Sequence, residues 1–343
     1  MTIFGIETSC DETAAAVVEN GVKEICSVVA SSKELHEETG GIVPEVAARK
    51  QVESITPVIQ ECFERYKESQ GFSSIKDCMR SVDAVAVTVG PGLVGSLVVG
   101  IEAAKALSLA LGKPIIPVNH LVGHIYANFI DNKDTIEFPA VALLVSGGHT
   151  DLVLVKDHHK LEYVGGTLDD AAGEAFDKVA RLLGLSKYLG GALLSKKAQE
   201  CEENTLKGKL PRPMLDQDNF DFSFSGLKTA ARRIVEEKKY STEVIAKEFE
   251  DAVVDVLTEK TIKAVKKFGV KTILLGGGVS ANTSLRDRFM KESARIGIKT
   301  HIPPIRLCTD NAVYIAGAAF FNNRPEKYEK IDANPALGIM DLL

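Results

Sequence analysis

Residues 140–155 read AVALLVSGGHTDLVLV, which is an apolar run, a turn of small and polar residues, and a second apolar run. Residues 3–18, IFGIETSCDETAAAVV, have the same construction. Two apolar runs joined by such a turn are typical of a β-hairpin. The sequence therefore predicts one hairpin in each half of the chain.

Each predicted hairpin is followed further along the chain by a strand, a glycine-rich loop and a helix. In the first half, the strand covers 84–89, and the helix after the loop at 90–95 ends at Gly112. In the second half, the strand covers 272–275 and the loop is the triple glycine 276–278. This repetition predicts a duplicated α/β core with two lobes and a nucleotide cleft between them.

The length of 343 residues also favours two lobes, because a single hydrophobic core seldom grows this large. We expect an N-terminal lobe over 1–135, with a C-terminal helix over 310–343 packing back on it, and a C-terminal lobe over 136–309. The longest predicted helix runs from about 241 to 268 and is ended by Gly269.

The composition limits the kinds of protein that this chain can be. Hydrophobic residues make up 45% and charged residues 26%, as in an ordinary globular protein. The formal net charge is -6, so any contact with RNA must come from a local patch or a partner. A lysine-rich stretch from 187 to 212 is interleaved with glutamates, so we interpret it as a solvated surface.

The six cysteines are scattered and include no C-x-x-C pair, which argues against a zinc ribbon or a thioredoxin-type site. Scattered cysteines suit a reducing compartment. We find no signal peptide, transit peptide or apolar run of membrane length. The sequence therefore predicts a cytoplasmic protein that does not associate with membranes.

Two histidines form the first candidate metal site. His120 and His124 follow Asn119, a good helix N-cap, and their i, i+4 spacing puts both on one helix face. Such a pair can bind zinc or iron, although two hydrogen-bonded surface histidines would show the same pattern. A metalloprotease needs H-E-x-x-H, and Leu121 stands where that glutamate would be. Protease activity is therefore disfavoured.

Two histidines do not complete a metal site, and a carboxylate is the expected third ligand. Asp310 begins an apolar segment after a loop with two prolines. An aspartate at that place could equally serve the dipole of a following helix. The residues alone leave both interpretations open.

Two glycine-rich turns are candidates for ligand binding. Residues 146–150, SGGHT, lie in the second predicted hairpin, where backbone N–H groups could approach a phosphate, although a plain hairpin turn is the commoner explanation. The triple glycine at 276–278 is a stronger signal, because glycines between a strand and a helix favour close approach of an anion. Neither turn matches the Rossmann or P-loop motif.

Two acidic segments complete the set of motifs. Residues 7–13, ETSCDET, include Asp11 and Glu12 in the first predicted hairpin turn. Residues 169–178, DDAAGEAFDK, place four acids at the start of a predicted helix. Carboxylates bind ribose hydroxyls, but acids at a helix start are also favoured by the helix dipole.

Nine strings, in order along nearly the whole chain, resemble one family. They are ETSCDET, GGIVPEVAAR, GPGLVGSLVVGIEAAKAL, NHLVGHIYAN, LLVSGGHTDL, DDAAGEAFDKVARLLGL, FDFSFSGLKTA, GGGVSANTSLR and CTDNAVYIA. The family is that of the tRNA adenosine threonylcarbamoyltransferases, formerly described as O-sialoglycoprotein endopeptidases. The resemblance implies a duplicated actin–hexokinase–heat-shock chaperone (ASKHA) fold.

The resemblance also implies functional residues. One divalent metal ion per subunit, iron or zinc, would be held by His120, His124 and Asp310. Asp11 and Glu12 match acids of the first turn and would be the catalytic groups that orient the attacking amine or take its proton. Threonylcarbamoyl-adenylate would lie against a set of residues drawn from four segments: Leu144, Val145, Ser146, Gly147, Gly148, Asp177, Gly190, Gly191 and Asn282.

The chain departs from the family pattern at several positions. The glycine pair follows Tyr188-Leu189 rather than Tyr-Pro and is shifted by one residue, which leaves the choice between Gly190 and Gly191 open. Ser195 stands where many members have Asp, and Gln51 where His is common. Leu144 and His149 are typical of the bacterial or organellar type, and without a transit peptide the bacterial type is favoured.

The activity implied is transfer of threonylcarbamoyl from the adenylate to N6 of the adenosine that follows the anticodon, at position 37 of tRNAs that read codons beginning with adenine. AMP is released. Family members in bacteria work with a smaller homologous subunit and an ATPase subunit. Two alternatives are a small-molecule kinase or ATPase of the same fold and a non-catalytic scaffold in a tRNA-modification complex.

Overall fold

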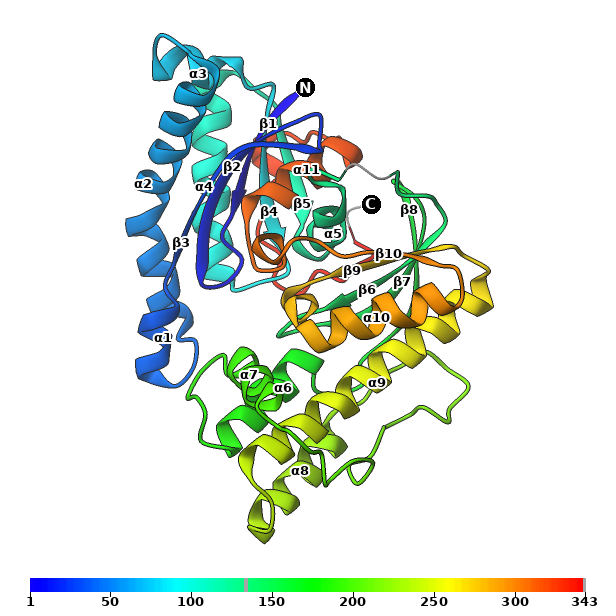
Figure 1. The fold of residues 1–343 in the computed structure, drawn as a ribbon. Coiled ribbons are helices and arrows are strands. Elements are labelled where there is room, and N and C mark those ends of the chain that lie inside the picture. Colours follow the sequence, from blue (N-terminus) through cyan, green and yellow to red (C-terminus); the bar gives the residue numbers. More distant parts are fainter. Residues whose placement is uncertain (133–134, 342–343) are drawn as a thin grey trace. The chain divides into compact units, whose positions relative to one another are not determined.

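The protein is described by a computed structural model that covers residues 1–132 and 135–341. The chain divides into two compact units (Figure 1). Unit 1 comprises residues 1–136, 158–160 and 309–343, and unit 2 comprises residues 137–157 and 161–308. The C-terminal segment therefore belongs to the same unit as the N-terminal residues.

Unit 1 is a five-stranded sheet with helices on both faces. Its elements are β1 (Thr2–Glu7), β2 (Glu12–Glu19), β3 (Lys23–Ser31), α1 (Lys33–Thr39), α2 (Pro44–Gln70), α3 (Ile75–Ser81), β4 (Ala84–Gly90), α4 (Val94–Leu111), β5 (Ile115–Asn119), α5 (His120–Tyr126), the 3₁₀ turns η1 (Ala127–Phe129) and η4 (Tyr328–Lys330), and α11 (Ala312–Asn322).

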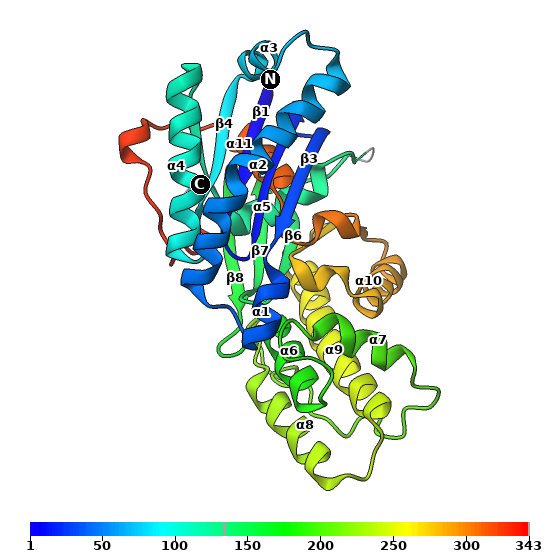
Figure 2. The same ribbon diagram turned by 90° about the vertical axis from the view of Figure 1, so that its left-hand side faces the viewer.

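The strand order in this sheet is β3-β2-β1-β4-β5. The predicted hairpin is confirmed, because β1 and β2 are antiparallel with Gly5 opposite Ala16. β4 and β5 are added in parallel. β2 and β3 pack against α2, and β4 against α4, while α11 packs against β1 and β2 (Figures 1 and 2). The polar ends of β1 and β5 thereby lie close to the start of α11.

The helix predicted over 310–343 is shorter than expected. α11 spans only Ala312–Asn322, and the chain then continues to residue 341 without another α-helix. Pro325 follows soon after, and proline disfavours helical backbone in the residue before it. The expected helix over 310–343 is therefore wrong beyond Asn322.

α4 corrects a second expectation. It is long and apolar enough, by length and composition, to cross a membrane, although the sequence was expected to contain no such run. One face of α4, including Leu97, Ile101 and Ala104, is buried in the core of unit 1. The core helix of a globular protein passes the same test of length and composition, so α4 by itself is weak evidence for a membrane span.

Unit 2 has a second five-stranded sheet. Its elements are β6 (Ala140–Val145), β7 (Thr150–Asp157), β8 (Lys160–Gly166), α6 (Ala172–Leu182), α7 (Gly191–Gln199), α8 (Ser225–Glu237), α9 (Thr242–Phe268), β9 (Thr272–Gly276), the 3₁₀ turns η2 (Gly278–Ala281) and η3 (Ile305–Leu307), α10 (Thr283–Arg295) and β10 (Lys299–His301).

The strand order of the second sheet is β8-β7-β6-β9-β10, which repeats the order of the first. β6 and β7 form the predicted antiparallel hairpin, and β9 pairs in parallel with β6. α9 ends at Gly269, as predicted, and packs against β6, α7 and α10. The prediction of a duplicated α/β fold is confirmed, and the loops after β6 and β9 lie side by side.

Candidate functional site

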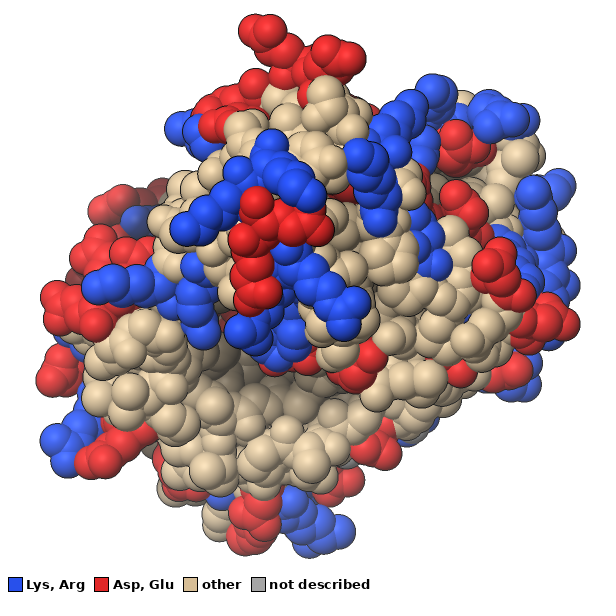
Figure 3. Space-filling view, turned by 90° about the horizontal axis from the view of Figure 1, so that it is seen from below, with Lys and Arg blue, Asp and Glu red and all other residues tan. Residues whose placement is uncertain are grey.

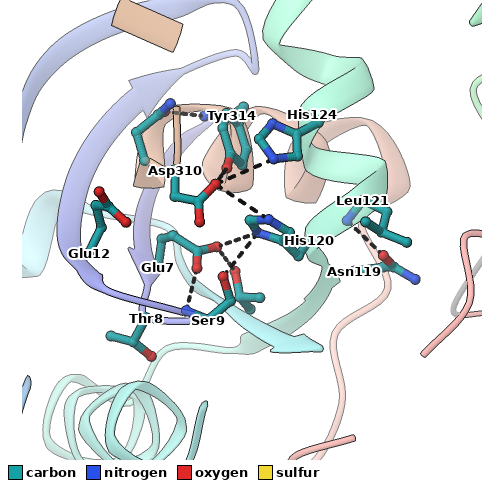
Figure 4. Close-up of polar contacts among 12 residues, drawn as sticks. Glu7, Thr8, Ser9, Glu12, Asn119, His120, Leu121, His124, Asp310 and Tyr314 are labelled. Carbon is teal, nitrogen blue, oxygen red and sulfur yellow. Dashed lines mark hydrogen bonds and ion pairs between the residues drawn. The ribbon is translucent and has the colours of Figure 1, made fainter. Parts of the chain in front are cut away.

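The histidine pair lies on α5, directly after β5. Asn119 caps the helix, since its Oδ1 accepts hydrogen bonds from the backbone N–H groups of Leu121 at 2.9 Å and Val122 at 3.5 Å. The helical spacing puts the rings of His120 and His124 together, with centroids 4.6 Å apart. Both side chains point toward Asp310 (Figure 4).

Asp310 lies two residues before the start of α11, next to its N-cap Asn311, and completes the cluster within unit 1. Its Oδ1 lies 3.5 Å from Nε2 of His120 and 3.4 Å from Nε2 of His124. One ligand atom from each of the three residues lies within 4.8 Å of the others. The structure therefore brings together the three predicted metal ligands.

The spacing of these atoms fits a small divalent ion. Two ligands about 2.0–2.1 Å from a tetrahedral ion lie about 3.3–3.4 Å apart, close to both nitrogen–oxygen distances in the cluster. Two imidazoles and one carboxylate form a donor set that suits zinc or iron and leaves coordination positions for a substrate. The residues present therefore fit a catalytic type of metal site.

Glu7, at the end of β1, supports the cluster, and sequence reasoning missed this role. Its Oε2 lies 3.1 Å from Nδ1 of His120 and accepts from the Thr88 hydroxyl at 2.5 Å, while Oε1 accepts from the Ser9 N–H at 2.5 Å. The Ser9 hydroxyl lies 3.3 Å from the same histidine nitrogen. An acid at the end of a buried strand was the available signal, but its partners come from distant segments.

Tyr314, one helical turn beyond Asp310, was also missed. It is fully buried, and its hydroxyl donates to Oδ1 of Asp310 at 3.5 Å. Burial and the nearby charge of Asp310 raise the pKa of Tyr314 well above its usual value, so the phenol keeps its proton. Tyr314 therefore orients the carboxylate as a neutral donor.

The charges in the cluster are strongly coupled. Burial lowers the pKa of His120, but attraction to Asp310 and Glu7 outweighs burial and raises it to about 9. Burial lowers the pKa of His124. Burial raises the pKa of Asp310, but the charge of His120 and the hydrogen bond with His124 prevail and lower it to about 2. Asp310 is therefore an anionic carboxylate that stabilises positive charge on the neighbouring histidine His120.

The two acids proposed as catalytic groups lie in the β1–β2 turn and at the start of β2. Asp11 is buried, and its backbone oxygen accepts from the N–H and the hydroxyl of Ser32, each at 2.9 Å. Burial, a hydrogen bond with Asp11 and the charge of Asp310 raise the pKa of Glu12 to about 10. Glu12 is therefore a proton-bearing donor at neutral pH.

Gln51, one of the departures from the family pattern, anchors this turn from α2. Its side chain is buried, and Nε2 lies 3.2, 2.9 and 3.1 Å from the backbone oxygens of Thr8, Cys10 and Glu12. An amide nitrogen can donate two hydrogen bonds, so these three acceptors share them. Gln51 thereby holds the turn that carries Glu7, Asp11 and Glu12 in its shape.

In unit 2, the turn after β6 exposes backbone donors. The Ser146 N–H closes the turn by donating a hydrogen bond to the backbone oxygen of His149 at 2.9 Å. The N–H groups of Gly147 and Gly148 make no hydrogen bond with the part of the chain that the structure describes. Leu144 and Val145 are fully buried, so neither presents its side chain to a ligand.

The loop after β9 approaches this turn closely. Gly277 has a φ of +88°, and a Cβ atom there would lie 2.4 Å from the backbone oxygen of Val145. Only glycine adopts this backbone conformation at low cost and fits the space. On the α6 side, the Gly173 N–H donates to the oxygen of Ser146 at 3.2 Å. The turn therefore lies between the triple-glycine loop and α6.

The two glycines between which the sequence left the ligand contact open have different neighbours in the structure. The Gly191 N–H donates to Oδ1 of Asp177 at 2.8 Å, which ties the start of α7 to α6. A Cβ atom at Gly190 would lie 2.5 Å from the Cβ of Ala180. Gly190 is therefore required for packing between α6 and α7, and Gly191 is the glycine that contacts the predicted ligand residue Asp177.

Asn282 joins the same region from the start of α10. Its Nδ2 donates to Oγ of Ser195 on α7 at 2.7 Å and to Oε1 of Glu250 on α9 at 2.7 Å. All the predicted ligand residues of unit 2 thus lie on segments that contact one another. Glu250 was not identified from the sequence, because a single glutamate on a long amphipathic helix gives no local signal.

A separate pocket of about 360 Å³ in unit 2 contains none of the predicted site residues. Its wall includes Arg212, Lys247 and Arg288, which pair with Asp251 and Asp255. Because the predicted site residues lie elsewhere in unit 2, the geometry of the loops after β6 and β9 remains the better guide to a ligand site.

The chain is similar to known proteins along nearly its whole length. The sequence profile of a family described as "tRNA N6-adenosine threonylcarbamoyltransferase" matches residues 23–317. A protein of that name from Syntrophomonas wolfei is 48% identical over 341 residues, covering 98% of this chain and 97% of its own. One from Bacillus subtilis is 50% identical over 324 residues, covering 93% of this chain and 89% of its own.

Solved structures share the fold at low sequence identity. HypF from T. kodakarensis has a TM-score of 0.60 at 14% identity, covering 94% of this chain and 47% of its own. Component A of (R)-2-hydroxyglutaryl-CoA dehydratase from Acidaminococcus fermentans has a TM-score of 0.53 at 13% identity, covering 96% of this chain and 99% of its own. These similarities support the ASKHA type of fold and, at such identities, nothing about activity.

Proposed function

Because this chain belongs to the tRNA N6-adenosine threonylcarbamoyltransferase family, we propose that it transfers a threonylcarbamoyl group from threonylcarbamoyl-adenylate to N6 of adenosine 37 in tRNAs that read codons beginning with adenine. The amine forms a bond to the carbamoyl carbon, the bond from that carbon to the phosphate oxygen breaks, and AMP leaves. The match to the family along nearly the whole chain carries this proposal.

Unit 2 binds the adenylate in this proposal. The unpaired N–H groups of Gly147 and Gly148 donate to an anionic oxygen, as backbone donors do in oxyanion sites. Asp177, Gly191 and Asn282 meet the rest of the nucleotide. The support is their mutual contact within one unit, through the hydrogen bonds from Gly191 to Asp177 and from Asn282 to Ser195.

Unit 1 holds one divalent ion, iron or zinc, on His120, His124 and Asp310. When bound, such an ion supplies Lewis-acid polarisation of a carbonyl or phosphate oxygen. Glu7 keeps Nε2 of His120 available as a ligand by accepting the proton on Nδ1. The support is the agreement of the nitrogen–oxygen distances with tetrahedral coordination.

Asp11 and Glu12 divide the proton chemistry. A pKa of about 10 keeps the proton on Glu12 at neutral pH, and Glu12 donates it to the Asp11 carboxylate, which it thereby orients. Asp11 is then the residue that takes the proton from the attacking amine. This division is supported by the hydrogen bond that the two carboxyl groups share.

Two surface features fit the proposed partners: a face rich in lysine and arginine fits tRNA, and exposed apolar side chains fit a partner subunit. The chain carries a net charge of -6, yet lysine and arginine side chains gather, with carboxylates among them, on a face that includes α8 (Figure 3). In unit 1, Val52, Val94, Val98 and Leu109 on α2 and α4 are 63%, 58%, 44% and 69% exposed. We infer that a smaller homologous subunit covers these exposed apolar side chains and that an ATPase subunit joins the complex.

A cytoplasmic location follows from the proposed tRNA substrate.

Transfer is tested by incubating the chain and its partner subunits with threonylcarbamoyl-adenylate and tRNA and measuring modified adenosine. The variant with both His120→Ala and His124→Ala is expected to lose this activity while remaining folded. A variant with full activity would exclude the metal role.

Two further measurements test the alternatives. Incubation with ATP and candidate acceptors, with and without a chelator, tests the first alternative, because a kinase or ATPase of this fold would consume ATP and leave adenosine 37 unmodified. A scaffold would support tRNA modification by its partners even when both histidines are replaced. Either result would contradict the proposed transferase.

A further inference from the structure

α9 carries two carboxylates into the interior of unit 2, and they differ in their partners. Glu248 is 0% exposed and pairs with Arg212 at 2.5 Å. Glu250 is 1% exposed and, among the described residues, makes no ion pair. A buried carboxylate without a cation is costly unless hydrogen bonds replace the water it loses. The groups that donate to Glu250 therefore indicate what it does.

The two oxygens of Glu250 each accept one hydrogen bond from the loop that begins α10. Oε1 accepts from Nδ2 of Asn282 and Oε2 accepts from the hydroxyl of Ser284, both at 2.7 Å. On the other side of the amide, Oδ1 of Asn282 accepts from the Leu285 N–H at 2.8 Å. If the amide turned over, its oxygen would face a carboxylate and its NH₂ group would face an N–H. The orientation of Asn282 is therefore determined from both sides.

The remaining proton of Nδ2 goes to Oγ of Ser195 at 2.7 Å. Because Ser195 accepts this hydrogen bond, its own hydroxyl proton stays available to donate. Oδ1 of Asn282 keeps a second lone pair, which stays available to accept. Glu250 thus leaves one acceptor and one donor side by side, next to the α7 helix that begins at Gly191.

We propose that Glu250 is a positioning residue that orients Asn282 and Ser195 to bind a ribose hydroxyl of the nucleotide. A ribose hydroxyl both donates and accepts one hydrogen bond, as this pair of groups requires. The assignment of Asn282 to a nucleotide rests on the proposed function. The identification of Glu250 rests on its two hydrogen bonds and on its burial without a cation.

Affinity for AMP, 2′-deoxy-AMP and 3′-deoxy-AMP tests this role without requiring transfer. The unchanged protein is expected to bind one of the deoxy nucleotides about tenfold more weakly than AMP. Glu250→Leu is expected to weaken AMP binding about tenfold and to abolish this discrimination. Glu250→Gln keeps an acceptor for Asn282 and should retain both properties. Glu248→Gln, the matched buried carboxylate on the same helix, should bind all three nucleotides as the unchanged protein does.

A second pair of variants covers the case in which Glu250→Leu fails to fold. Asn282→Asp places two carboxylates together and should weaken AMP binding. Adding Glu250→Gln supplies an amide donor to Asp at 282 and should recover AMP affinity at least about fivefold relative to Asn282→Asp alone. A glutamate that only fills space would give no such recovery.

Several results would overturn the inference. They are unchanged discrimination in folded Glu250→Leu, equal binding of AMP and both deoxy nucleotides by the unchanged protein, absence of AMP binding, or no recovery in the double variant. Failure of the proposed function is a different result. A protein that discriminates among these nucleotides through Glu250 but leaves tRNA unmodified would keep the inference and exclude the transferase.

Discussion

Nδ1 of His120 lies 3.1 Å from Oε2 of Glu7, and this contact decides which nitrogen of His120 faces Asp310. Glu7 accepts the Nδ1 proton, so Nε2, 3.5 Å from Asp310, is the nitrogen that would bind a metal in place of its own proton. The two residues lie 113 positions apart and meet because β1 and β5 flank β4 in one sheet.

Glu7→Gln should weaken metal binding by about tenfold to a hundredfold, the usual effect of losing a residue that orients a metal ligand. The dissociation constant for Zn²⁺, measured by competition with a chromophoric chelator, checks this. Glu12→Gln is the matched control from the same hairpin. Since a pKa of about 10 keeps Glu12 neutral at pH 7, its replacement by a neutral amide should leave Zn²⁺ affinity within about threefold. Equal losses in the two variants would contradict the role given to Glu7.

Metal removal should lower the thermal stability of the protein. A ligand that binds only the folded state at 100 times its dissociation constant stabilises that state by about 2.7 kcal/mol. For a unit of this size, this amounts to a fall in Tm of about 5–10 °C when a chelator is added. Circular dichroism during heating measures the shift. The variant with both histidines replaced should melt at the same temperature with and without chelator, and an equal shift in that variant would place the metal elsewhere.

Gly277→Ala should destabilise unit 2 by about 2–5 kcal/mol. The new Cβ would lie 2.4 Å from the oxygen of Val145, at a φ of +88° that alanine adopts only with strain. Gly278→Ala is the control, because a Cβ there meets nothing within 4 Å, and its cost should stay below about 1 kcal/mol. Urea unfolding of both variants gives the comparison. Similar free energies of unfolding for the two variants would contradict the prediction, because they would mean that the loop after β9 accommodates the new Cβ at little cost.

Asp151 should make the stability of unit 2 depend on pH. Burial raises its pKa from 3.8 to about 6, although the Tyr163 hydrogen bond opposes this. The folded chain therefore holds the Asp151 proton more tightly than the unfolded chain does. This contribution favours folding below about pH 4 and is lost as the pH rises through about 6.

Asp151→Asn removes the titration and keeps an acceptor for Tyr163. The free energy of unfolding of the unchanged protein should fall, relative to that of Asp151→Asn, by about 1–2 kcal/mol between pH 4 and pH 7. Urea unfolding at both pH values measures the difference. A constant difference between the two proteins would show that Asp151 is ionised at both pH values.

The local features of the fold were predictable from the sequence because their causes lie within a few residues. Apolar runs joined by a polar turn identified both hairpins, and Gly112 and Gly269 ended α4 and α9 as expected. The third strand of each sheet, β3 and β8, was not predicted. Most residues of β3 are only partly buried, so its sequence lacks the continuous apolar run that identified β1 and β6.

The sequence by itself determined that His120 and His124 share a helix face, since helical geometry and the Asn119 cap are local. Only the tertiary structure decided that Asp310 faces them, rather than serving a helix dipole, and that Glu7 and Tyr314 orient the cluster. In unit 2, only the packing of α9 against α10 revealed Glu250 beside Asn282. Chain spacing carries no information about such contacts, because they depend on which strands are neighbours in a sheet and on which helix faces meet.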